Sequence, residues 1–282
     1  MLIKLFYFNR EVFILFFTFV KMKQRAFDVL GNIALVNFND GTSLRDKKIF
    51  ADKILKENNA IKTVLEKKGK VKGRLRKIET IHISGDKTKE VLYRENGCSF
   101  RFNIDTTYFS PRLSGERKDV SSKIKKDDEV LVMFAGVAPF SIVIAKNKNV
   151  KKVYSNEINR EANKYAKLNI ELNNLKSKVE LVNGDIKKVA ENLRKEKKKF
   201  DVIVMPRPNL KESFLKYAFD LSKKGTRIFY YGFCRVGEEK LIIAEIKAEA
   251  KKAKKKVRII RKKKAGEIAP YKIRLRVDLV VE

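Results

Sequence analysis

Residues 128–140 read DEVLVMFAGVAPF, and this stretch decides how the rest of the chain is interpreted. Its apolar run, 130–134, is typical of a strand buried on both faces of a sheet. Ala135 and Gly136 predict a tight turn after the strand, and Pro139 suits the first turn of a following helix. A small residue followed by glycine lets backbone N–H groups approach a ligand beside a helix N-terminus. The stretch therefore predicts a nucleotide-type pocket at the end of a first strand, although helix packing without a ligand would also use such a glycine.

The sequence after this stretch alternates between strand-like and helix-like segments. The further expected strands are VKKVYSNEI, KVELVNGDI, FDVIVMP, GTRIFYYGF, KVRIIRK and YKIRLRVDLVVE. Between them lie NREANKYAKLNIELNNL, IKKVAENLRKEKKK, NLKESFLKYAFDLSKK and EEKLIIAEIKAEAKKAKKK, which we expect to be helices. The pattern predicts an α/β fold over 127–282: a doubly wound, Rossmann-like sheet of seven strands whose last two form an antiparallel edge.

Acidic residues stand at the ends of the second and third expected strands. Glu157 occupies the place where such sheets hold a ribose, because a carboxylate accepts hydrogen bonds from both hydroxyls. Asp185 can accept from an adenine amine while the N–H of Ile186 meets a ring nitrogen. Either acid alone is more often a helix cap, but with the glycine turn they indicate an adenosyl site. No GxxxxGK[ST] motif occurs, and seven strands with these acids favour S-adenosylmethionine over NAD.

The composition indicates a polyanionic partner and a reducing compartment. The 282 residues carry a formal net charge of +32, which is usually tolerated for nucleic acid, although Lys-rich surfaces also mark heat-adapted proteins. Cys98 and Cys234 form neither a metal-ligand spacing nor a disulfide framework, so we expect a cytoplasmic protein. His82 is the only histidine, which leaves no His-rich metal site, and we expect no metal.

The N-terminal segment 1–25 is strongly apolar and is treated as an extension. Lys4, Arg10 and Glu11 interrupt it, and the nine uncharged residues after Glu11 are too few to span a bilayer. A signal peptide would need a small-residue cleavage site, which is absent. We expect that the protein begins at Met22; a peripheral membrane anchor is the alternative.

Two further segments precede the large domain. Short strand-like runs, Gly turns and one amphipathic helix predict a small α+β module over 26–105. The helix is expected to turn four residues inward: Phe50, Ala51, Ile54 and Leu55. Residues 106–126 are a connector in which Pro111 precludes a central strand. Its charged residues suit either a catalytic loop or a solvated linker.

Several segments together resemble one family, the archaeal and eukaryotic tRNA (guanine-37-N1)-methyltransferases. They are FDVLGNIALV, KTVLEKKGKVKGRLR, YFSPRLSGER, VLVMFAGVAPFSI, NEIN, LNIELN, NGD and APYKIRLRVDL. The resemblance extends over nearly all of 26–282, and YFSPRL…ER followed by MFAGVAPFS is a specific combination. It implies transfer of the methyl group of S-adenosylmethionine to N1 of guanine 37, beside the anticodon of tRNA, by a monomeric enzyme away from membranes.

The resemblance also implies roles for individual residues. Glu116 matches the carboxylate that removes the N1 proton, a general base. Arg112 looks like the residue that stabilises charge on guanine O6, and Arg76 resembles an arginine of the small domain that supports the nucleotide. Tyr108 matches a tyrosine that stacks on the base, and Arg117 a position associated with the cofactor. The residues expected to contact the cofactor are Arg117, Phe134, Ala135, Gly136, Glu157, Asp185, Ile186 and Pro206.

The chain departs from the family pattern at three points. Ala138 stands where the family usually has a second glycine, which is expected only to narrow the loop. Residues 205–209 read MPRPN, so Pro206 replaces the family Asn, and Asn209 is displaced from that place. Many archaeal members have an additional N-terminal domain, for which the sequence before residue 26 has no room.

Alternatives to this function remain at the level of sequence. Between 247 and 264, eleven of eighteen residues are Lys or Arg, which suits either phosphate contacts or a solvated helix face, and Ile259 and Ile260 indicate that the run ends as a strand. The MPRP segment leaves open a related enzyme of wyosine synthesis, which transfers a methyl or aminocarboxypropyl group to a modified guanine. A non-catalytic RNA-binding protein is the second alternative.

Overall fold

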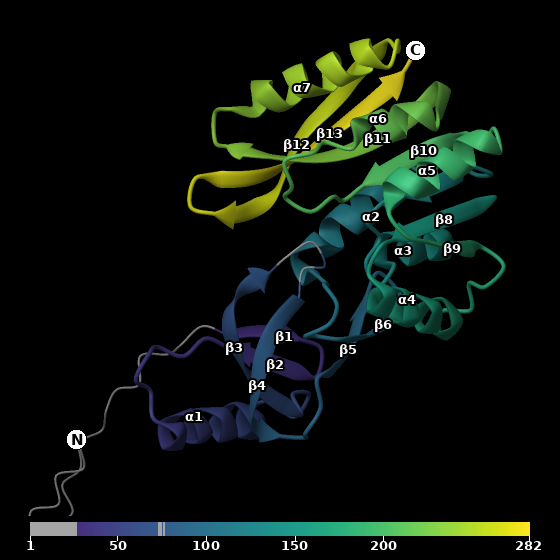
Figure 1. The fold of residues 1–282 in the computed structure, drawn as a ribbon. Helices are drawn as coiled ribbons and strands as arrows, with labels where there is room; N and C mark the ends of the chain where they lie inside the picture. The colour runs from purple at the N-terminus through teal and green to yellow at the C-terminus, as the bar shows by residue number, and fades with distance from the viewer. Residues whose placement is uncertain (1–26, 73–74, 76) are drawn as a thin grey trace, which may run out of the picture.

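The seven expected strands form a single mixed sheet in the computed structural model, which describes residues 27–72, 75 and 77–282 (Figure 1). The spatial order is β12-β13-β11-β10-β7-β8-β9. The pairs among β7 to β11 are parallel, whereas β13 is antiparallel to β11 and to β12. The strands are β7 (Glu129–Val132), β8 (Lys152–Glu157), β9 (Val179–Asn183), β10 (Phe200–Met205), β11 (Ser222–Arg235), β12 (Val257–Ala269) and β13 (Lys272–Val281). The expected seven-stranded, doubly wound class with an antiparallel edge is confirmed.

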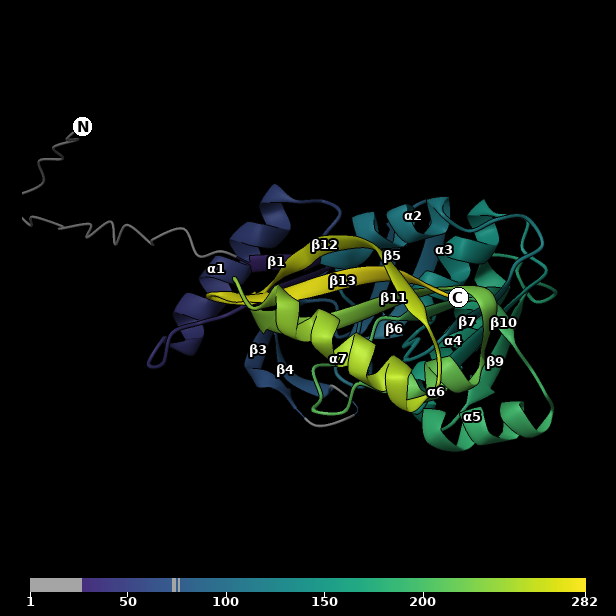
Figure 2. The ribbon, with the colours of Figure 1, turned by 90° about the horizontal axis from the view of Figure 1, so that it is seen from above.

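Six helices cover the two faces of this sheet. One face packs against α2 (Ser114–Ser122), α3 (Pro139–Asn147) and α4 (Arg160–Leu172), the other against α5 (Ile186–Lys195), α6 (Leu215–Asp220) and α7 (Glu239–Lys252) (Figure 2). The central strand β7 supplies both cores, because successive side chains of a strand point to opposite faces. Val130 and Val132 pack with the first set of helices and Leu131 with the second. This double burial explains the uninterrupted apolar run in the sequence.

One expected helix is much shorter than predicted. NLKESFLKYAFDLSKK was expected to be helical throughout, but α6 starts only at Leu215, and Phe214 before it has a left-handed φ of 61°. The reason is Arg207, which is buried and donates from Nη1 to the carbonyl oxygens of Leu210 and Glu212 at 2.9 and 3.1 Å. These bonds occupy carbonyl groups that a helix would need and keep the segment after β10 irregular.

The N-terminal part forms a smaller four-stranded sheet with one helix, below the large sheet in Figure 1. Its elements are β1 (Phe27–Leu30), β2 (Ile33–Val36), α1 (Leu44–Glu57), β3 (Thr63–Lys72) and β4 (Lys77–Gly85), and the strand order is β1-β2-β3-β4. Of the four side chains expected to face inward from α1, Phe50, Ala51 and Ile54 are buried and Leu55 is half-buried. The small α+β unit therefore has its own core.

A separate hairpin connects the two sheets. It consists of β5 (Glu90–Glu95) and β6 (Cys98–Asn103). On one side, the Asn32 side chain of the small unit accepts a hydrogen bond from the β5 backbone at 2.7 Å. On the other side, Asn169 of α4 and Asn173 at its C-cap each donate to and accept from the β6 backbone, at 2.7 to 3.0 Å. The hairpin thus fixes the small unit to the large one.

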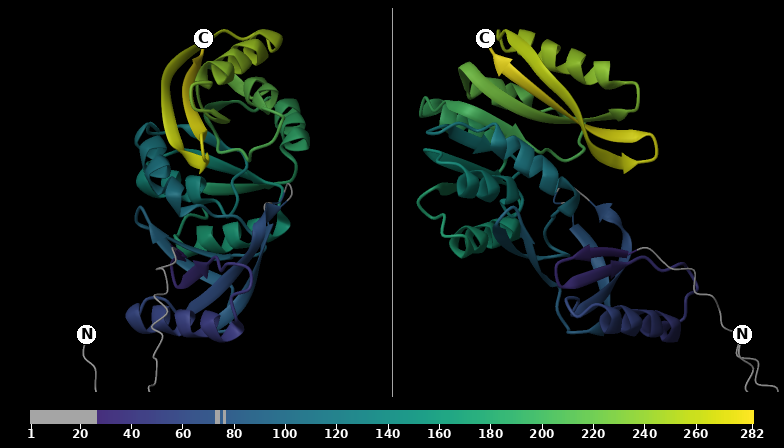
Figure 3. Two further views of the ribbon diagram at one scale, coloured as in Figure 1. Left: turned by 90° about the vertical axis from the view of Figure 1, so that its left-hand side faces the viewer. Right: turned by 180° about the vertical axis from the view of Figure 1, so that it is seen from behind.

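The antiparallel edge lies at the opposite end of the sheet from β9. Figure 3 shows the β12–β13 pair, in yellow, along this outer edge. The basic run 247–264 occupies the end of α7 and most of β12, and the expectation that it ends as a strand is confirmed. None of the described helices is long and apolar enough to cross a membrane. The extension 1–25 and Arg76 lie outside the described residues.

Candidate active site

A cleft of about 1020 Å³, measured to its open mouth, lies at the carboxyl ends of β7, β8 and β10. The strand order reverses between β7 and β10, and this is where open α/β sheets bind ligands. Eight sequence-predicted residues line it: Tyr108, Arg117, Phe134, Ala135, Gly136, Glu157, Ile186 and Pro206. Asp185 lies between Gly184 and Ile186, which both line the cleft, whereas Glu116 and Arg112 are not among the lining residues. Leu75, beside the undescribed Arg76, also reaches the wall.

The glycine turn is shaped by close backbone contacts. Gly136 has a φ of 59°, and a Cβ placed on it would lie 3.3 Å from the carbonyl oxygen of Tyr108. Glycine is therefore favoured here both by the left-handed backbone conformation and by the close approach of another segment. Ala138 has a φ of 66°, a left-handed conformation that costs an alanine about 1–2 kcal/mol. Ala138 therefore adds backbone strain to the turn, an effect that the sequence did not predict; the expected narrowing of the loop stays a prediction.

Glu157 ends β8 as predicted, and backbone groups hold its carboxylate. Oε2 accepts from the N–H of Gly136 at 2.8 Å, and Oε1 accepts from the N–H groups of Ile158 and Asn159 at 2.9 and 2.8 Å. Asn159 also caps α4 through its side chain. The carboxylate thereby joins the turn after β7 to the turn after β8 and lies on the cleft wall, where it can accept hydroxyl donors.

The remaining cleft wall is largely apolar. The rings of Phe134 and Phe214 meet edge to face with centroids 5.0 Å apart, and Ile186 and Pro206 continue the same wall. Asp185 caps α5 by accepting from the N–H of Lys187 at 3.1 Å. An adenosyl group needs an apolar surface for its adenine and a carboxylate for its ribose hydroxyls. The cleft has both, beside the N-terminus of α5, so the residues fit S-adenosylmethionine.

Arg117 supports the cleft from inside the protein. Its side chain is 1% exposed, and its guanidinium binds both oxygens of Glu95 and donates to the Ser110 carbonyl oxygen at 3.0 Å. The guanidinium carbon also lies 4.9 Å from the ring centroid of Phe109 and 5.9 Å from that of Phe140. Arg117 therefore ties the cleft wall to the hairpin through Nε and Nη2.

Glu116 lies one hydrogen bond behind the cleft wall. It is 6% exposed on α2, and its Oε2 accepts from Arg276 Nη1 at 2.7 Å and from the Tyr231 hydroxyl at 3.2 Å. Its Oε1 lies 2.5 Å from the Nζ of Lys263. Tyr231 itself lines the cleft, and burial together with the charge of Glu116 raises its pKa well above the ordinary value. The phenol therefore remains a proton donor to Glu116 at neutral pH.

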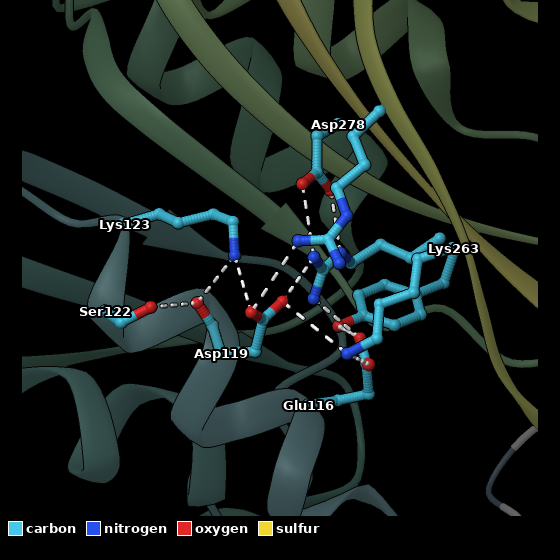
Figure 4. Close-up of polar contacts among 9 residues, drawn as sticks. Glu116, Asp119, Ser122, Lys123, Lys263 and Asp278 are labelled. Carbon is cyan, nitrogen blue, oxygen red and sulfur yellow. Dashed lines mark hydrogen bonds and ion pairs between the residues drawn. The ribbon is translucent and has the colours of Figure 1, made fainter.

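Glu116 belongs to a cluster of charges in which Arg276 and Asp278 are buried and Asp119, Lys123 and Lys263 are partly exposed (Figure 4). Arg276 is fully buried and contacts Asp278 at 2.7 Å and Asp119 at 2.5 Å. Burial opposes the charged form of Asp119, but hydrogen bonds from Lys123 and Arg276 outweigh it and lower the pKa of Asp119. Burial would likewise lower the pKa of Arg276, but Tyr231 and the acids around it raise that pKa. Both shifts favour the charged forms of Asp119 and Arg276 at neutral pH.

Arg112 is placed away from this cluster. Its side chain is 75% exposed, and it pairs with Asp28 of the small unit at 3.1 Å. The connector thus places Glu116 against β12 and β13, whereas Arg112 points toward solvent. In its described part, the structure brings the expected cofactor residues and Tyr108 to one cleft but does not bring Arg112 to Glu116.

Sequence reasoning missed the partners of Glu116. Lys263, Arg276 and Tyr231 come from the C-terminal strands, far from Glu116 in sequence. One signal was present: in KIRLRVDL, apolar residues alternate with charged ones, which predicts a strand whose second face needs ionic partners. Among the described residues, no group of three or more His, Cys, Asp or Glu side chains could hold a metal ion.

The chain is similar to known methyltransferases along most of its length. The family model for the TRM5/TYW2 methyltransferase domain matches residues 91–260, and that for the TYW2 N-terminal domain matches 19–88. The Pyrococcus abyssi tRNA (guanine(37)-N(1))-methyltransferase Trm5b is 33% identical over 91% of this chain and 74% of its own length. Its crystal structure superposes with a TM-score of 0.79 over 91% of this chain and 75% of that one.

Two other proteins add detail. A solved complex of aTrm5 with tRNALeu is 29% identical, with a TM-score of 0.78 over 91% of this chain and 72% of that chain. The Nanoarchaeum equitans tRNA (guanine(37)-N(1))/4-demethylwyosine(37)-methyltransferase Taw22 is 29% identical over 90% of this chain and 99% of its own length. Other curated relatives are longer: the chain spans 66% and 42% of two of them.

Proposed function

This chain belongs to the TRM5/TYW2 methyltransferase family, and we propose that it methylates N1 of guanine 37 in tRNA. One observation carries the proposal. A buried carboxylate, Glu116, is linked through the Tyr231 hydroxyl to the wall of a cleft that fits an adenosyl group. A methyl transfer to a protonated ring nitrogen needs both parts, a site for the donor and a base beside it.

The cofactor residues hold the donor in the proposed reaction. S-adenosylmethionine supplies an electrophilic methyl group. Glu157 accepts hydrogen bonds from the ribose hydroxyls, and Phe134, Ile186 and Pro206 form the apolar wall for the adenine. Gly136 lets the turn lie against the Tyr108 backbone and donates its N–H to Glu157, which holds the ribose acceptor in place.

Four side chains act on the guanine. Glu116 accepts the N1 proton as the new N–C bond forms, and the proton later passes to solvent. Arg112 leaves Asp28 and places its guanidinium at O6, where negative charge develops. Tyr108, on the cleft wall, stacks on the base, and Arg76 supports the nucleotide from the small unit.

The partner in this proposal is the anticodon region of tRNA. The exposed lysines of α7 and β12 supply phosphate contacts, which give affinity without reading sequence. The two cysteines are unpaired, in keeping with a monomer that acts in the reducing cytoplasm.

Substitution of the base tests the proposal. Glu116→Gln keeps the shape of the side chain but cannot take a proton, so we expect single-turnover methyl transfer to slow about 10²–10⁴-fold. Cofactor affinity should stay within a few-fold, because the lost interaction is made mainly in the transition state. Glu196→Gln, at an exposed position after α5, is the matched control and should leave the rate unchanged. Wild-type transfer by Glu116→Gln, with an unchanged pH profile, contradicts the assigned base.

A second candidate substrate is favoured by the similarity to the Nanoarchaeum protein, whose length this chain matches almost completely. The name of that protein includes methylation of 4-demethylwyosine at the same tRNA position. Nucleoside mass spectrometry separates the two substrates when the protein is incubated with tRNA that carries either guanine or 4-demethylwyosine at position 37. Product from the guanine tRNA supports the main proposal, and product from the modified tRNA alone replaces it.

A further inference from the structure

The two oxygens of Glu116 have different partners. Oε2 is bound by Arg276 and by Tyr231, two side chains that are fully buried. Arg276 is also held by Asp119 and Asp278, so it has no freedom to leave. Oε1 is contacted by Lys263 at 2.5 Å. The carboxylate is therefore anchored through one oxygen and covered at the other.

Lys263 differs from Arg276 in its mobility. Its side chain is 32% exposed, and it belongs to β12, the outer strand of the sheet. Arg261, Lys262 and Lys264 on the same strand are exposed. A lysine on a flexible four-carbon stem at such an edge can exchange one anion for another, since an ammonium binds carboxylate and phosphate alike.

An exchange of partner by Lys263 would change the balance of charge around Glu116. The groups around Glu116 are Asp119 of α2, Lys123 at the C-cap of α2, Tyr231 of β11, Arg276 and Asp278 of β13, and Arg261 and Lys263 of β12. Three carboxylates, those of Glu116, Asp119 and Asp278, are balanced by the three close cations Arg276, Lys263 and Lys123. Removal of Lys263 takes one positive charge from the cluster: Glu116 loses its contact at Oε1, and Asp119 loses a longer contact of 3.7 Å.

We propose that Lys263 covers Glu116 in the RNA-free enzyme and moves to a phosphate of the bound RNA, so that the base is exposed only when substrate is present. The proposal rests on Glu116 being the base of the proposed function. After the exchange, the N1–H bond breaks and its proton passes to Oε1, while Arg276 and Tyr231 hold Oε2 in place. Lys263 is a positioning residue in this scheme, because it acts through Glu116.

A binding cycle without cofactor tests the exchange. Dissociation constants for an unmodified tRNA transcript are measured for wild type, Glu116→Gln, Lys263→Met and the double variant. In wild type the carboxylate competes with phosphate for Lys263, so Glu116→Gln should bind the transcript roughly three- to ten-fold more tightly. In the Lys263→Met background, the same Glu116→Gln change should have no effect. An equal gain in both backgrounds overturns the proposal, because it would reflect only the loss of a negative charge.

A neighbouring lysine provides the matched control. Lys262→Met removes the same charge from an exposed position on the same strand, and in that background Glu116→Gln should keep its full gain. Lys263→Arg retains a cation and should keep the gain as well. Loss of the gain with Lys262→Met contradicts a specific role for Lys263.

Kinetics distinguish a movable cover from a static support. At saturating tRNA, Lys263→Met should transfer methyl within about three-fold of the wild-type rate. Its defect should be a rise in the tRNA concentration that gives half of the maximal rate. A loss of ten-fold or more at saturation would show that Lys263 holds Glu116 during the reaction, and would overturn the proposal. The binding cycle needs no methyl transfer, so it tests the exchange even if the proposed reaction is wrong.

Discussion

Glu157 lies on the cleft wall and Glu116 lies behind it, and the protein holds the two carboxylates in opposite ways. Glu157 accepts three backbone N–H groups from the turns after β7 and β8, all within 21 residues of it. Glu116 is held by side chains, Arg276 and Lys263, that lie 160 and 147 residues further along the chain. Backbone donors are part of the fold and cannot leave. Cationic side chains add charge, and a half-exposed one can change partner.

From this contrast we expect different roles for the two carboxylates. A carboxylate fixed by backbone groups suits the binding of a cofactor, since its position depends only on the local turns. A carboxylate fixed by ion pairs suits proton transfer, because its effective charge changes when one cation is withdrawn. The following predictions test this difference.

Arg276→Met should have the largest effect on stability. It leaves the buried Glu116 and Asp278 and the partly exposed Asp119 without their shared cation, and breaking a buried pair costs about 3–5 kcal/mol of unfolding free energy. Urea unfolding measures the loss. Arg261→Met is the control, because Arg261 is about half exposed and lies 3.9 Å from Asp119, which limits its cost to under about 1 kcal/mol. Equal losses for the two variants would mean that the cluster does not stabilise the fold.

Glu157→Ala should weaken S-adenosylmethionine binding by about 1–3 kcal/mol. The change removes the proposed ribose acceptor and strands the N–H groups of Gly136, Ile158 and Asn159. Isothermal titration calorimetry measures the affinity. Glu180→Ala, an exposed position on the neighbouring strand β9, should bind as wild type does. An unchanged affinity of Glu157→Ala rejects the ribose role.

Acid should weaken the ion cluster through Asp119. The folded protein lowers the pKa of Asp119, so the stability that this group adds is complete above the unfolded pKa of about 3.9. That stability is lost as the pH falls below this value toward the folded pKa. Unfolding free energies measured across this range should fall more steeply for wild type than for Asp119→Asn, by up to about 1.4 kcal/mol per pH unit. Parallel slopes would show that Asp119 gains nothing from Lys123 and Arg276.

Ala138→Gly should have the smallest effect, at the cofactor turn. Relief of the left-handed alanine is worth about 1–2 kcal/mol, and the greater freedom of glycine in the unfolded chain cancels about 0.5–1 kcal/mol of it. We therefore expect a stabilisation of about 0.5–1 kcal/mol by thermal unfolding, with little change in cofactor affinity. Gly136→Ala is the opposite case, because its φ is 59° and its Cβ would approach the Tyr108 carbonyl. A gain in stability from Gly136→Ala would contradict the geometry of this turn.

Much of the cofactor cleft could be predicted from the sequence, because the residues that form it lie close together along the chain. The apolar run 130–134, the turn at Gly136 and the acid at the end of a strand follow one another within about 30 residues. Alternating strands and helices then allow few topologies, so the seven-stranded sheet and its antiparallel edge follow from the order of the elements. The positions of Glu157 and Ile186 beside the cleft result from the rule that parallel strands end at one edge.

The surroundings of Glu116 were decided only by the tertiary structure. Lys263 and Arg276 reach α2 because β12 and β13 pair at the far edge of the sheet. No short sequence pattern predicts which helix packs against the side chains of these two strands. The early end of the helical pattern before Leu215 has the same origin, since Arg207 binds carbonyl groups through a geometry that periodicity does not describe. The sequence determined the fold and the cofactor cleft through local spacing. The ion-pair partners of the candidate base lie up to 160 residues away in the sequence, and only the assembled sheet brings them together.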